Sequence, residues 1–258
     1  MPYVTVKGIN IYYKNTIGNS LPIVFVHGAG GSSQRWSDQL ASFDGKCNSW
    51  AMDLPGHGKS EGSLLSNIKE MAEFIDDFVG ALCLRKFVLV GHSMGGAIAQ
   101  EFTLQYPGKL RGLILIGTGA RLKVSKGILD SLAAEQMPFK DVNHLYGSST
   151  LDDQREEALR EMNELSPAVY KADFEVCNKF DSTFSIEKIK APCLVIVGDE
   201  DIMTPVKYSQ FLNSKLLNSQ LKIIMGAGHM CMQEKHAEVT EEIESFIQQL
   251  TVTNITVS

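Results

Sequence analysis

The sequence predicts an α/β fold in which a mostly parallel β-sheet is covered by helices on both faces. Short strand-like runs alternate with amphipathic helical patterns along most of the chain, as a doubly wound sheet requires. Several of these runs are continuously apolar and rich in β-branched residues, which is typical of strands buried on both faces. The chain has 258 residues, 44% of them hydrophobic, which is enough for one large domain with a sizeable core.

Eight strands are expected. The first alternates polar and apolar residues, whereas several later ones are uniformly apolar. The expected strands cover residues 3–6, 9–13, 22–26, 49–52, 87–90, 113–116, 194–197 and 221–224. Two amphipathic helices are predicted most clearly, over 67–82 and 235–250, because apolar residues recur there at intervals of three and four.

One long stretch interrupts this alternation. Residues 120–190 contain no convincing strand, but they contain helical patterns and several aromatic residues. We therefore predict a core formed by 1–119 and 191–258, and a helical insertion over 120–190 that lies above the carboxyl ends of the strands. An ordinary pair of sheet-covering helices is the alternative, but one crossover connection needs far fewer residues.

Composition argues against several classes of function. The net charge of −6, without any basic run, disfavours a nucleic-acid-binding surface. No apolar run approaches the roughly 18 residues of a membrane span, and the N-terminus does not resemble a secretory signal. The five cysteines lack metal-like spacing, so reduced thiols in a cytoplasmic protein are expected. We expect a small-molecule substrate, with neither nucleic acid nor membrane as partner, and leave a homo-oligomer open.

The strongest motif is G-x-S-x-G at residues 91–95, within the segment VLVGHSMGGA. A buried strand precedes it and a helical pattern follows, the context in which this motif places a nucleophilic serine on a strained turn. Gly91 and Gly95 are expected to be required because side chains there would collide where the strand and helix approach. The N–H groups of the following helix would then point at charge that develops beside Ser93.

Further motifs also follow predicted strands: HGAG at 27–30, DLPGHGKS at 53–60, GDED at 198–201 and GAGH at 226–229. With the serine turn, and in this order, they resemble the α/β-hydrolase superfamily over residues 3–250. The insertion falls where members of that superfamily carry a cap. Among capped members the chain looks most like carboxylesterases and meta-cleavage C–C hydrolases. The resemblance implies the α/β-hydrolase fold, with an eight-stranded sheet, and a serine hydrolase.

The resemblance also implies a catalytic triad of Ser93, Asp201 and His229. A serine hydroxyl is a weak nucleophile at neutral pH and needs a base to take its proton. Of the six histidines, His229 follows the last strand and completes the Ser…Asp…His order of this fold. Asp201 is preferred to Asp199 and Glu200 because it fits the superfamily's pattern Gly-x-x-Asp-x-x-x-Pro.

The oxyanion of a tetrahedral intermediate needs two preorganised N–H donors. By resemblance these are the backbone N–H groups of Met94, directly after the nucleophile, and of Ala29, which we prefer to Gly30. No cofactor is implied, because the glycine-rich and G-K-S segments lack glycines that dinucleotide and Walker A sites need. No metal is expected either, since the sequence has no metal-like histidine or cysteine cluster.

Four other histidines lie near these motifs or in the insertion. His27 and His57 are expected to brace loops, and His92 to point away from its neighbour Ser93. His144 lies in the insertion and could contact substrate, although a surface position is expected.

The first expectation for the reaction is hydrolysis of a carboxylic ester of a small to medium, largely apolar substrate through an acyl-enzyme on Ser93. The same residues would serve a haloperoxidase-like perhydrolase, or a meta-cleavage C–C hydrolase, which also needs polar groups for a substrate carboxylate. Arg35 and Arg121 lie near the cleft in sequence, but exposed positions are expected for both. A ligand receptor is the non-enzymatic alternative, and the complete triad disfavours it. Residues that could line a pocket, or equally belong to the core, are Trp36, Met94, Met203 and Met230.

Overall fold

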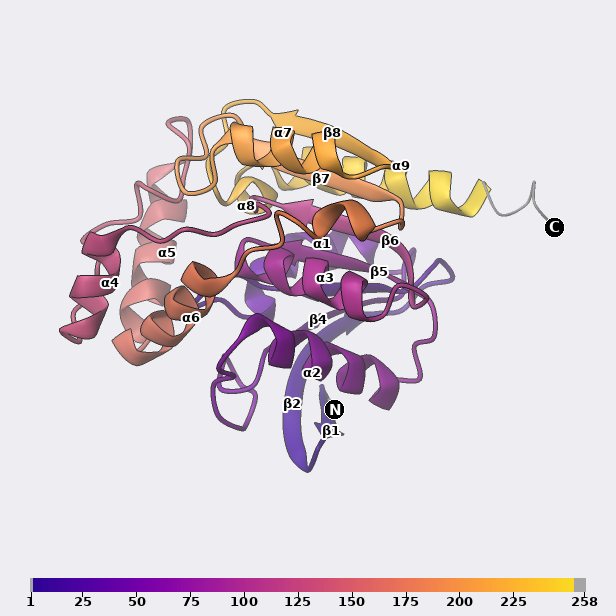
Figure 1. Cartoon of the computed structure of the whole chain (residues 1–258), viewed down its shortest axis with the longest axis horizontal. Coiled ribbons are helices and arrows are strands. Elements are labelled where there is room, and N and C mark those ends of the chain that lie inside the picture. Colours follow the sequence, from indigo (N-terminus) through magenta and orange to yellow (C-terminus); the bar gives the residue numbers. More distant parts are fainter. Residues whose placement is uncertain (1, 253–258) are drawn as a thin grey trace.

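The computed structural model describes residues 2–252, so residue 1 and residues 253–258 of the predicted core lie outside the described part of the chain. An eight-stranded sheet with the order β1-β2-β4-β3-β5-β6-β7-β8 forms its centre (Figure 1). The strands are β1 (Tyr3–Val6), β2 (Ile9–Thr16), β3 (Ile23–Val26), β4 (Ser49–Met52), β5 (Phe87–His92), β6 (Leu110–Ile116), β7 (Cys193–Gly198) and β8 (Ser219–Ile224). Strand β2 runs antiparallel to both of its neighbours, and the remaining pairs are parallel. The predicted strands and the mostly parallel sheet are confirmed.

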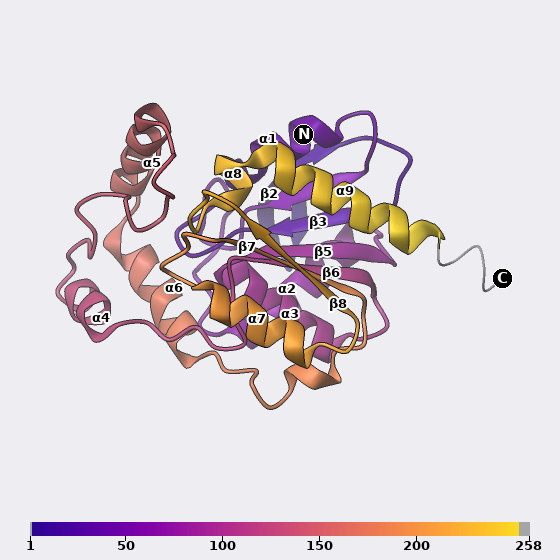
Figure 2. The same cartoon turned by 90° about the horizontal axis from the view of Figure 1, so that it is seen from above.

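Helices cover both faces of the sheet (Figure 2). One face carries α1 (Ser37–Phe43), α8 (Cys231–Glu234) and α9 (His236–Val252), and the other carries α2 (Ile68–Ala81), α3 (Met94–Gln105) and α7 (Val206–Lys215). Successive residues of β3 belong to opposite cores: Val24 packs with α2 and α3, whereas Phe25 packs with α1. This is the two-sided burial that uniformly apolar strands predict.

Local sequence explains where the predicted helices begin. The side chain of Asn67 accepts a hydrogen bond from the N–H of Glu70 at 2.8 Å and so caps α2. The buried stripe of α2, which includes Met71 and Ile75, then packs on the sheet. Helix α9 occupies the other predicted segment. Within the part of the chain that the structure describes, none of the helices has the length and apolar character needed to cross a membrane.

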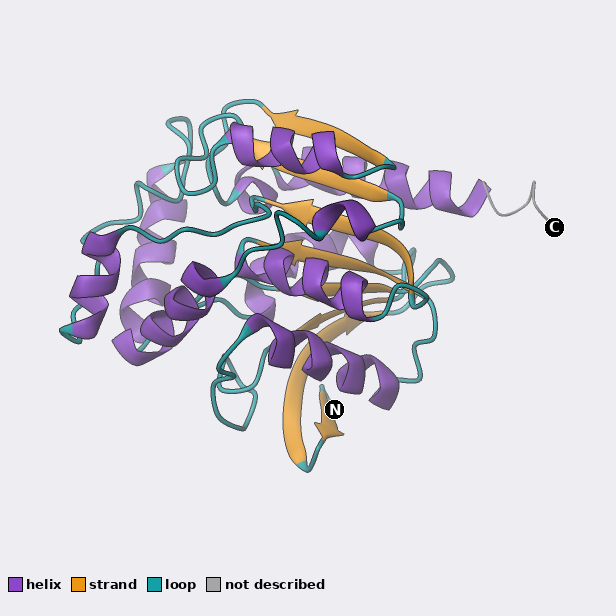
Figure 3. Ribbon diagram, in the orientation of Figure 1, coloured by secondary structure: helices purple, strands orange, loops and turns teal. Residues whose placement is uncertain are grey.

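The segment 120–190 contains α4 (Lys126–Ala133), α5 (Asp152–Glu164) and α6 (Pro167–Lys179), which we call the cap helices. They gather on the side of the molecule toward which the arrowheads of the parallel strands point (Figure 3). An isolated β-bridge between Arg121 and Asp181 joins the chain entering this group to the chain leaving it. The short 3₁₀ helix η2 (Ile186–Lys188) that follows packs on α3 and α7 in the core.

Candidate active site

Ser93 occupies the tight turn between β5 and α3, with a left-handed backbone conformation (φ 52°, ψ −115°) that residues other than glycine rarely adopt. The turn is possible only because Gly91 and Gly95, two residues before and two residues after Ser93, have no side chains. A Cβ atom on Gly91 would lie 2.2 Å from the carbonyl oxygen of Gly95, and one on Gly95 would lie 2.3 Å from that of Val26. The expected collisions are confirmed. The hydroxyl of Thr118, in the loop after β6, donates to the carbonyl of Ser93 at 2.8 Å and so stabilises the turn.

Asp201 and His229 form a buried pair. Nδ1 of His229 lies 2.9 Å from Oδ2 of Asp201, and the hydroxyl of Thr204 donates to the same oxygen at 2.8 Å. The N–H groups of Met203 and Thr204 donate to Oδ1 of Asp201 at 2.9 and 2.8 Å. Burial alone would raise the pKa of Asp201, but His229 and these hydrogen bonds lower it to about 2. Asp201 is therefore a carboxylate at neutral pH, and His229 lines the same cavity as Ser93.

Two backbone N–H groups beside Ser93 are available to a ligand. Met94 is the first residue of α3, where an N–H has no partner in its own helix. Within residues 2–252, the N–H groups of Met94 and Ala29 have no hydrogen-bond acceptor in the protein. The N–H of Gly30, in contrast, donates to Oδ2 of Asp173 at 2.7 Å. This bond supports the preference for Ala29 over Gly30 as an oxyanion donor.

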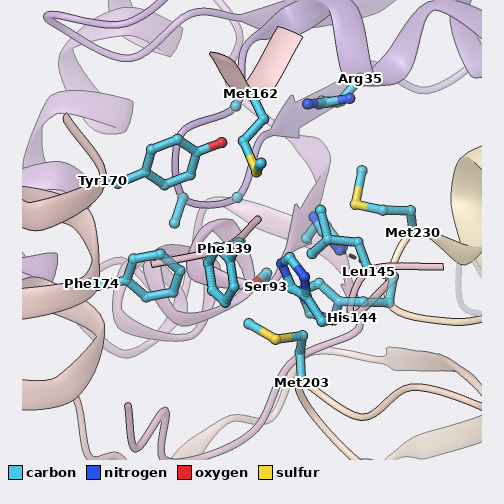
Figure 4. A pocket seen from close by; sticks show the side chains of 15 residues that line it. Arg35, Ser93, Phe139, His144, Leu145, Met162, Tyr170, Phe174, Met203 and Met230 are labelled. Carbon is cyan, nitrogen blue, oxygen red and sulfur yellow. Dashed lines mark hydrogen bonds between the residues drawn. The ribbon is translucent and has the colours of Figure 1, made fainter. Parts of the chain in front are cut away.

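Two cavities meet at Ser93. The inner cavity has a volume of about 60 Å³ (Figure 4), and the outer cavity has a volume of about 300 Å³. Residues that line both are Ala29, Ser93, Phe174 and Met203. The inner cavity is otherwise lined mainly by apolar and aromatic side chains, including Phe139, Leu145, Met162, Tyr170 and Met230. The outer cavity combines apolar side chains with two lysines and includes Leu122, Lys123, Val124, Ile128 and Lys207.

The comparisons agree with this geometry. The family model described as "alpha/beta hydrolase fold" matches residues 22–235. The chain belongs to the alpha/beta hydrolase family. It is similar to the solved structure of a thermophilic esterase, with 33% identity and a TM-score of 0.83 over 96% of this chain and 97% of that one. A lipase-esterase related protein from Clostridium acetobutylicum is 26% identical, with a TM-score of 0.81 over 92% of this chain and 99% of its own. The proline iminopeptidase of Saccharolobus solfataricus is 27% identical over 96% of this chain and 92% of its own length.

The expected pocket residues of this alpha/beta hydrolase are confirmed only in part. Met203 and Met230 line the inner cavity, whereas the side chains of Trp36 and Met94 are fully buried in the two cores on either face of the sheet. The two candidates in the loops after β7 and β8 therefore line the cavity, whereas Trp36, at the end of a short 3₁₀ helix (Ser33–Trp36), and Met94, at the start of α3, do not.

Two expectations of surface positions are wrong. Arg35 lines the inner cavity with its side chain only 13% exposed, because its guanidinium pairs with Glu161 of α5 at 2.6 Å. His144 lines the same cavity and stacks on Phe139, with ring centroids 3.8 Å apart. Contacts with residues of the segment 120–190 leave both residues only partly exposed. Arg121 is exposed, as expected.

The other histidines of this hydrolase support loops. Nε2 of His27 accepts from the N–H of Leu54 at 3.1 Å, which ties the loop after β3 to the loop after β4. His92 turns from Ser93 toward the last loop, where its Nε2–H donates to the carbonyl of His229 at 3.0 Å. Burial, with a neighbouring histidine in each case, lowers the pKa values of His27 and His92 to about 3. Both are neutral at pH 7.

Lowering the pH from 7 to 5 is therefore expected to destabilise the protein through His27 and His92. Above the ordinary histidine pKa of about 6.5, both are neutral in the folded and the unfolded state. Between about 6.5 and 3, the unfolded chain binds protons that the folded protein does not bind. The free energy of unfolding thus falls as the pH falls, by about 2 kcal/mol per histidine at pH 5.

The measurement is the Tm of the wild type and of His92→Gln between pH 7 and 5. Glutamine keeps an N–H donor for the carbonyl of His229 but does not titrate, so the Tm of the variant should depend less steeply on pH. His57, whose pKa is raised, has the opposite effect on stability and is common to both proteins. Equal pH dependence in the two proteins would contradict the prediction, and His27→Gln provides a second variant.

Three residues that support the site were missed from the sequence. Thr204 binds Asp201, and a hydroxyl three residues after an aspartate is a recognisable turn pattern that could have identified it. Glu234 accepts from the N–H groups of Gly228 and Gly147 at 2.8 and 2.6 Å, and so joins the His229 loop to the cap. Asp173 carries no local signal, because its partners Gly30 and His57 come from distant parts of the chain. The bond from Gly147 to Glu234 also joins segments that are far apart in sequence.

Proposed function

We propose that this alpha/beta hydrolase is a serine esterase, which cleaves carboxylic esters of small, largely apolar molecules through an acyl-enzyme on Ser93. The observation that carries the proposal is the position of Ser93, at the junction of two mainly apolar cavities and beside the buried pair of Asp201 and His229. We assign the oxyanion hole to the N–H groups of Ala29 and Met94, and the roof of the site to a cap over residues 120–190.

In the proposed reaction, Nε2 of His229 takes the proton of Ser93 as the hydroxyl oxygen attacks the ester carbonyl. Asp201 fixes the histidine tautomer with the proton on Nδ1 and stabilises the imidazolium that forms. Collapse of the tetrahedral intermediate breaks the bond to the alcohol, which leaves with the proton from His229. A water molecule, activated by the same histidine, then attacks the acyl-enzyme and releases the acid.

The cavity sizes suggest which part of the ester each cavity takes. The inner cavity, at about 60 Å³, is less than half the volume of the engineered cavity of about 150 Å³ that accommodates benzene. It suits a short acyl group of two to four carbons. The outer cavity, at about 300 Å³, suits the larger alcohol part. Because both cavities include Ser93, an ester that spans them would place its carbonyl at the nucleophile.

The charges of the lining residues favour an ester over the substrates of other relatives. A substrate with a free N-terminal amine is cationic and calls for a carboxylate. Neither cavity is lined by an aspartate or glutamate within residues 2–252. A dienol-ketone acid calls for a cation. In the inner cavity the guanidinium of Arg35 is already paired with Glu161, and Lys123 and Lys207 line only the outer cavity. The similarity to an esterase at 33% identity supports the same choice.

The test is a panel of p-nitrophenyl esters with acyl chains of two to twelve carbons, beside prolyl p-nitroanilide and a dienol-ketone acid. We expect kcat/KM to be highest for acetyl to butyryl esters and to fall at least about 10-fold for octanoyl esters, since the inner cavity cannot hold them. Met162, which is buried and lines only the inner cavity, limits its size. Met162→Ala should move the optimum to a longer acyl chain.

Ile128→Ala is the matched control, because Ile128 lines only the outer cavity. It should change the preferred alcohol and leave the acyl optimum in place. If the anilide or the dienol-ketone were the faster substrate, the esterase proposal would be rejected. An acyl optimum that moved equally in both variants would reject the assignment of the two cavities.

A further inference from the structure

A second buried carboxylate–histidine pair lies behind the loop after β3 that carries Ala29 and Gly30, which we call the oxyanion loop. Asp173, on cap helix α6, is only 1% exposed. Its Oδ2 accepts the backbone N–H of Gly30 at 2.7 Å and lies 2.9 Å from Nε2 of His57. The three residues come from the cap, the loop after β3 and the loop after β4. Within the described part of the chain, Oδ1 of Asp173 has no partner, so Oδ2 makes both of these bonds.

The geometry makes this pair an ion pair. Nδ1 of His57 lies 3.1 Å from the carbonyl oxygen of Pro55, which can only accept a hydrogen bond. Nε2 faces a carboxylate oxygen of Asp173, which accepts a hydrogen bond. Both contacts are hydrogen bonds when each ring nitrogen of His57 carries a proton, which makes the ring an imidazolium. Burial alone would lower the pKa of His57, but the hydrogen bond and the charge of Asp173 raise it above its usual value. The imidazolium balances the buried carboxylate, which would otherwise be costly.

The same helix also fixes Gly30 through a second residue. Gly30 has φ +62°, and a Cβ atom there would lie 2.4 Å from the ring of Tyr170. Tyr170 and Asp173 are three positions apart on α6, so they lie on the same side of the helix. Ring and carboxylate together hold the backbone of Gly30 from the cap side. The bond from Gly30 to Asp173 also leaves the preceding N–H, that of Ala29, without a competing acceptor.

We propose that Asp173, charge-balanced by His57, is a positioning residue that sets the oxyanion loop from the cap by holding the N–H of Gly30. The inference rests on the proposed function, because it assumes that Ala29 donates to the oxyanion. An N–H donor acts on the transition state only if it lies at hydrogen-bond distance from the developing charge. Without the hydrogen bond to Asp173, the oxyanion loop can rotate and move the N–H of Ala29 away from the oxyanion. We therefore expect kcat to fall, while substrate binding in the cavities is little changed.

The experiment compares Asp173→Ala with Asp173→Asn. Alanine removes the acceptor of Gly30, and kcat for p-nitrophenyl butyrate should fall about 10- to 100-fold while KM stays within about 3-fold. Asparagine keeps an oxygen that can accept from Gly30, so it should recover most of the lost kcat. A trifluoromethyl ketone, which forms a tetrahedral adduct with an oxyanion, should lose affinity in proportion to kcat/KM.

Glu200→Gln is the matched control. Glu200 also accepts hydrogen bonds from the cap, from the N–H and hydroxyl of Ser148 at 2.6 and 3.0 Å, but it does not touch the oxyanion loop. This variant should keep its kcat within about 3-fold. If Asp173→Ala lowers the Tm and raises KM without lowering kcat or the affinity for the ketone, Asp173 only holds the cap in place and the proposal is wrong. Equal losses in the alanine and asparagine variants would also overturn it.

Labelling of Ser93 by a fluorophosphonate tests the same idea without any ester. The P=O oxygen of the reagent must also enter the oxyanion hole as Ser93 attacks phosphorus, so Asp173→Ala should slow labelling by a similar factor. If no ester is turned over but labelling is slowed, the proposed function fails and the positioning role stands. Unchanged labelling overturns the positioning role. Asp173→Leu, which fills a similar volume with an apolar group, replaces the alanine variant if that variant does not fold.

Discussion

Replacing Ser93 by alanine is expected to lower kcat for p-nitrophenyl butyrate by about 10⁶-fold. The hydroxyl is the only group of the proposed triad that bonds to the acyl carbon, so no neighbouring side chain can replace it. The fold should tolerate the change. Alanine retains the Cβ atom of serine, so the left-handed turn at φ 52° is equally strained in both proteins. The Tm of the variant should lie close to that of the wild type.

The measurement pairs steady-state turnover with fluorophosphonate labelling followed by mass spectrometry. The wild type should carry one label, on Ser93, and the variant none. Circular dichroism and Tm serve as controls for folding. Activity of the purified variant above about 1% of the wild type would contradict the assignment of Ser93 as nucleophile, since it far exceeds the rate expected from binding and the oxyanion hole alone.

Replacing Asp201 by asparagine should lower kcat by about 10⁴-fold, less than His229→Ala, which should approach the loss in Ser93→Ala. Asparagine keeps the size of the side chain and can still accept from Met203 and Thr204. It offers an N–H to Nδ1 of His229, however, and so favours the tautomer with the proton on Nε2. That tautomer cannot take the proton of Ser93.

Asp199→Asn is the matched control for the acid. Asp199 lies two residues from Asp201, but its Oδ1 accepts a hydrogen bond from the N–H of Gly226 at 2.6 Å. Its hydrogen bonds are thus to the backbone of the loop after β8 and not to the ring of His229. Asparagine can keep that bond, so kcat should change less than about 10-fold. If Asp199→Asn proved more damaging than Asp201→Asn, the acid would be assigned to the wrong aspartate.

Much of the fold could be predicted because its signals are local. The apolar strands and helix α2 follow from the spacing of apolar residues along the chain. The turn at Ser93 was predictable in detail, because side chains at Gly91 and Gly95 would collide with Gly95 and with Val26 of the adjacent strand β3, respectively. Thr204 could also have been predicted as a partner of Asp201, because it is a hydroxyl residue three positions after the aspartate. In each case the residues that make the prediction possible lie within a few positions of one another in the sequence.

The walls of the site could not be predicted in the same way. Arg35 and His144 were expected at the surface, but both line the inner cavity and are only partly exposed, because residues of the segment 120–190 contact them. A helix in the cap shows an amphipathic pattern in sequence, but the pattern does not say which part of the core it covers. The position of the cap helices over the core decides which side chains line the cavities. This position depends on contacts between segments that are far apart in the chain.

The sequence by itself determined the α/β architecture, the serine turn and the order of the candidate triad. Burial of a strand on both faces and the strained turn depend on residue types at short spacings along the chain, so they leave a readable pattern in the sequence. Only the tertiary structure decided the sizes of the two cavities and the partners of Asp173, which lies 143 positions from Gly30 and 116 from His57. A buried charge gains a partner wherever packing supplies one, and no spacing in the sequence records that choice.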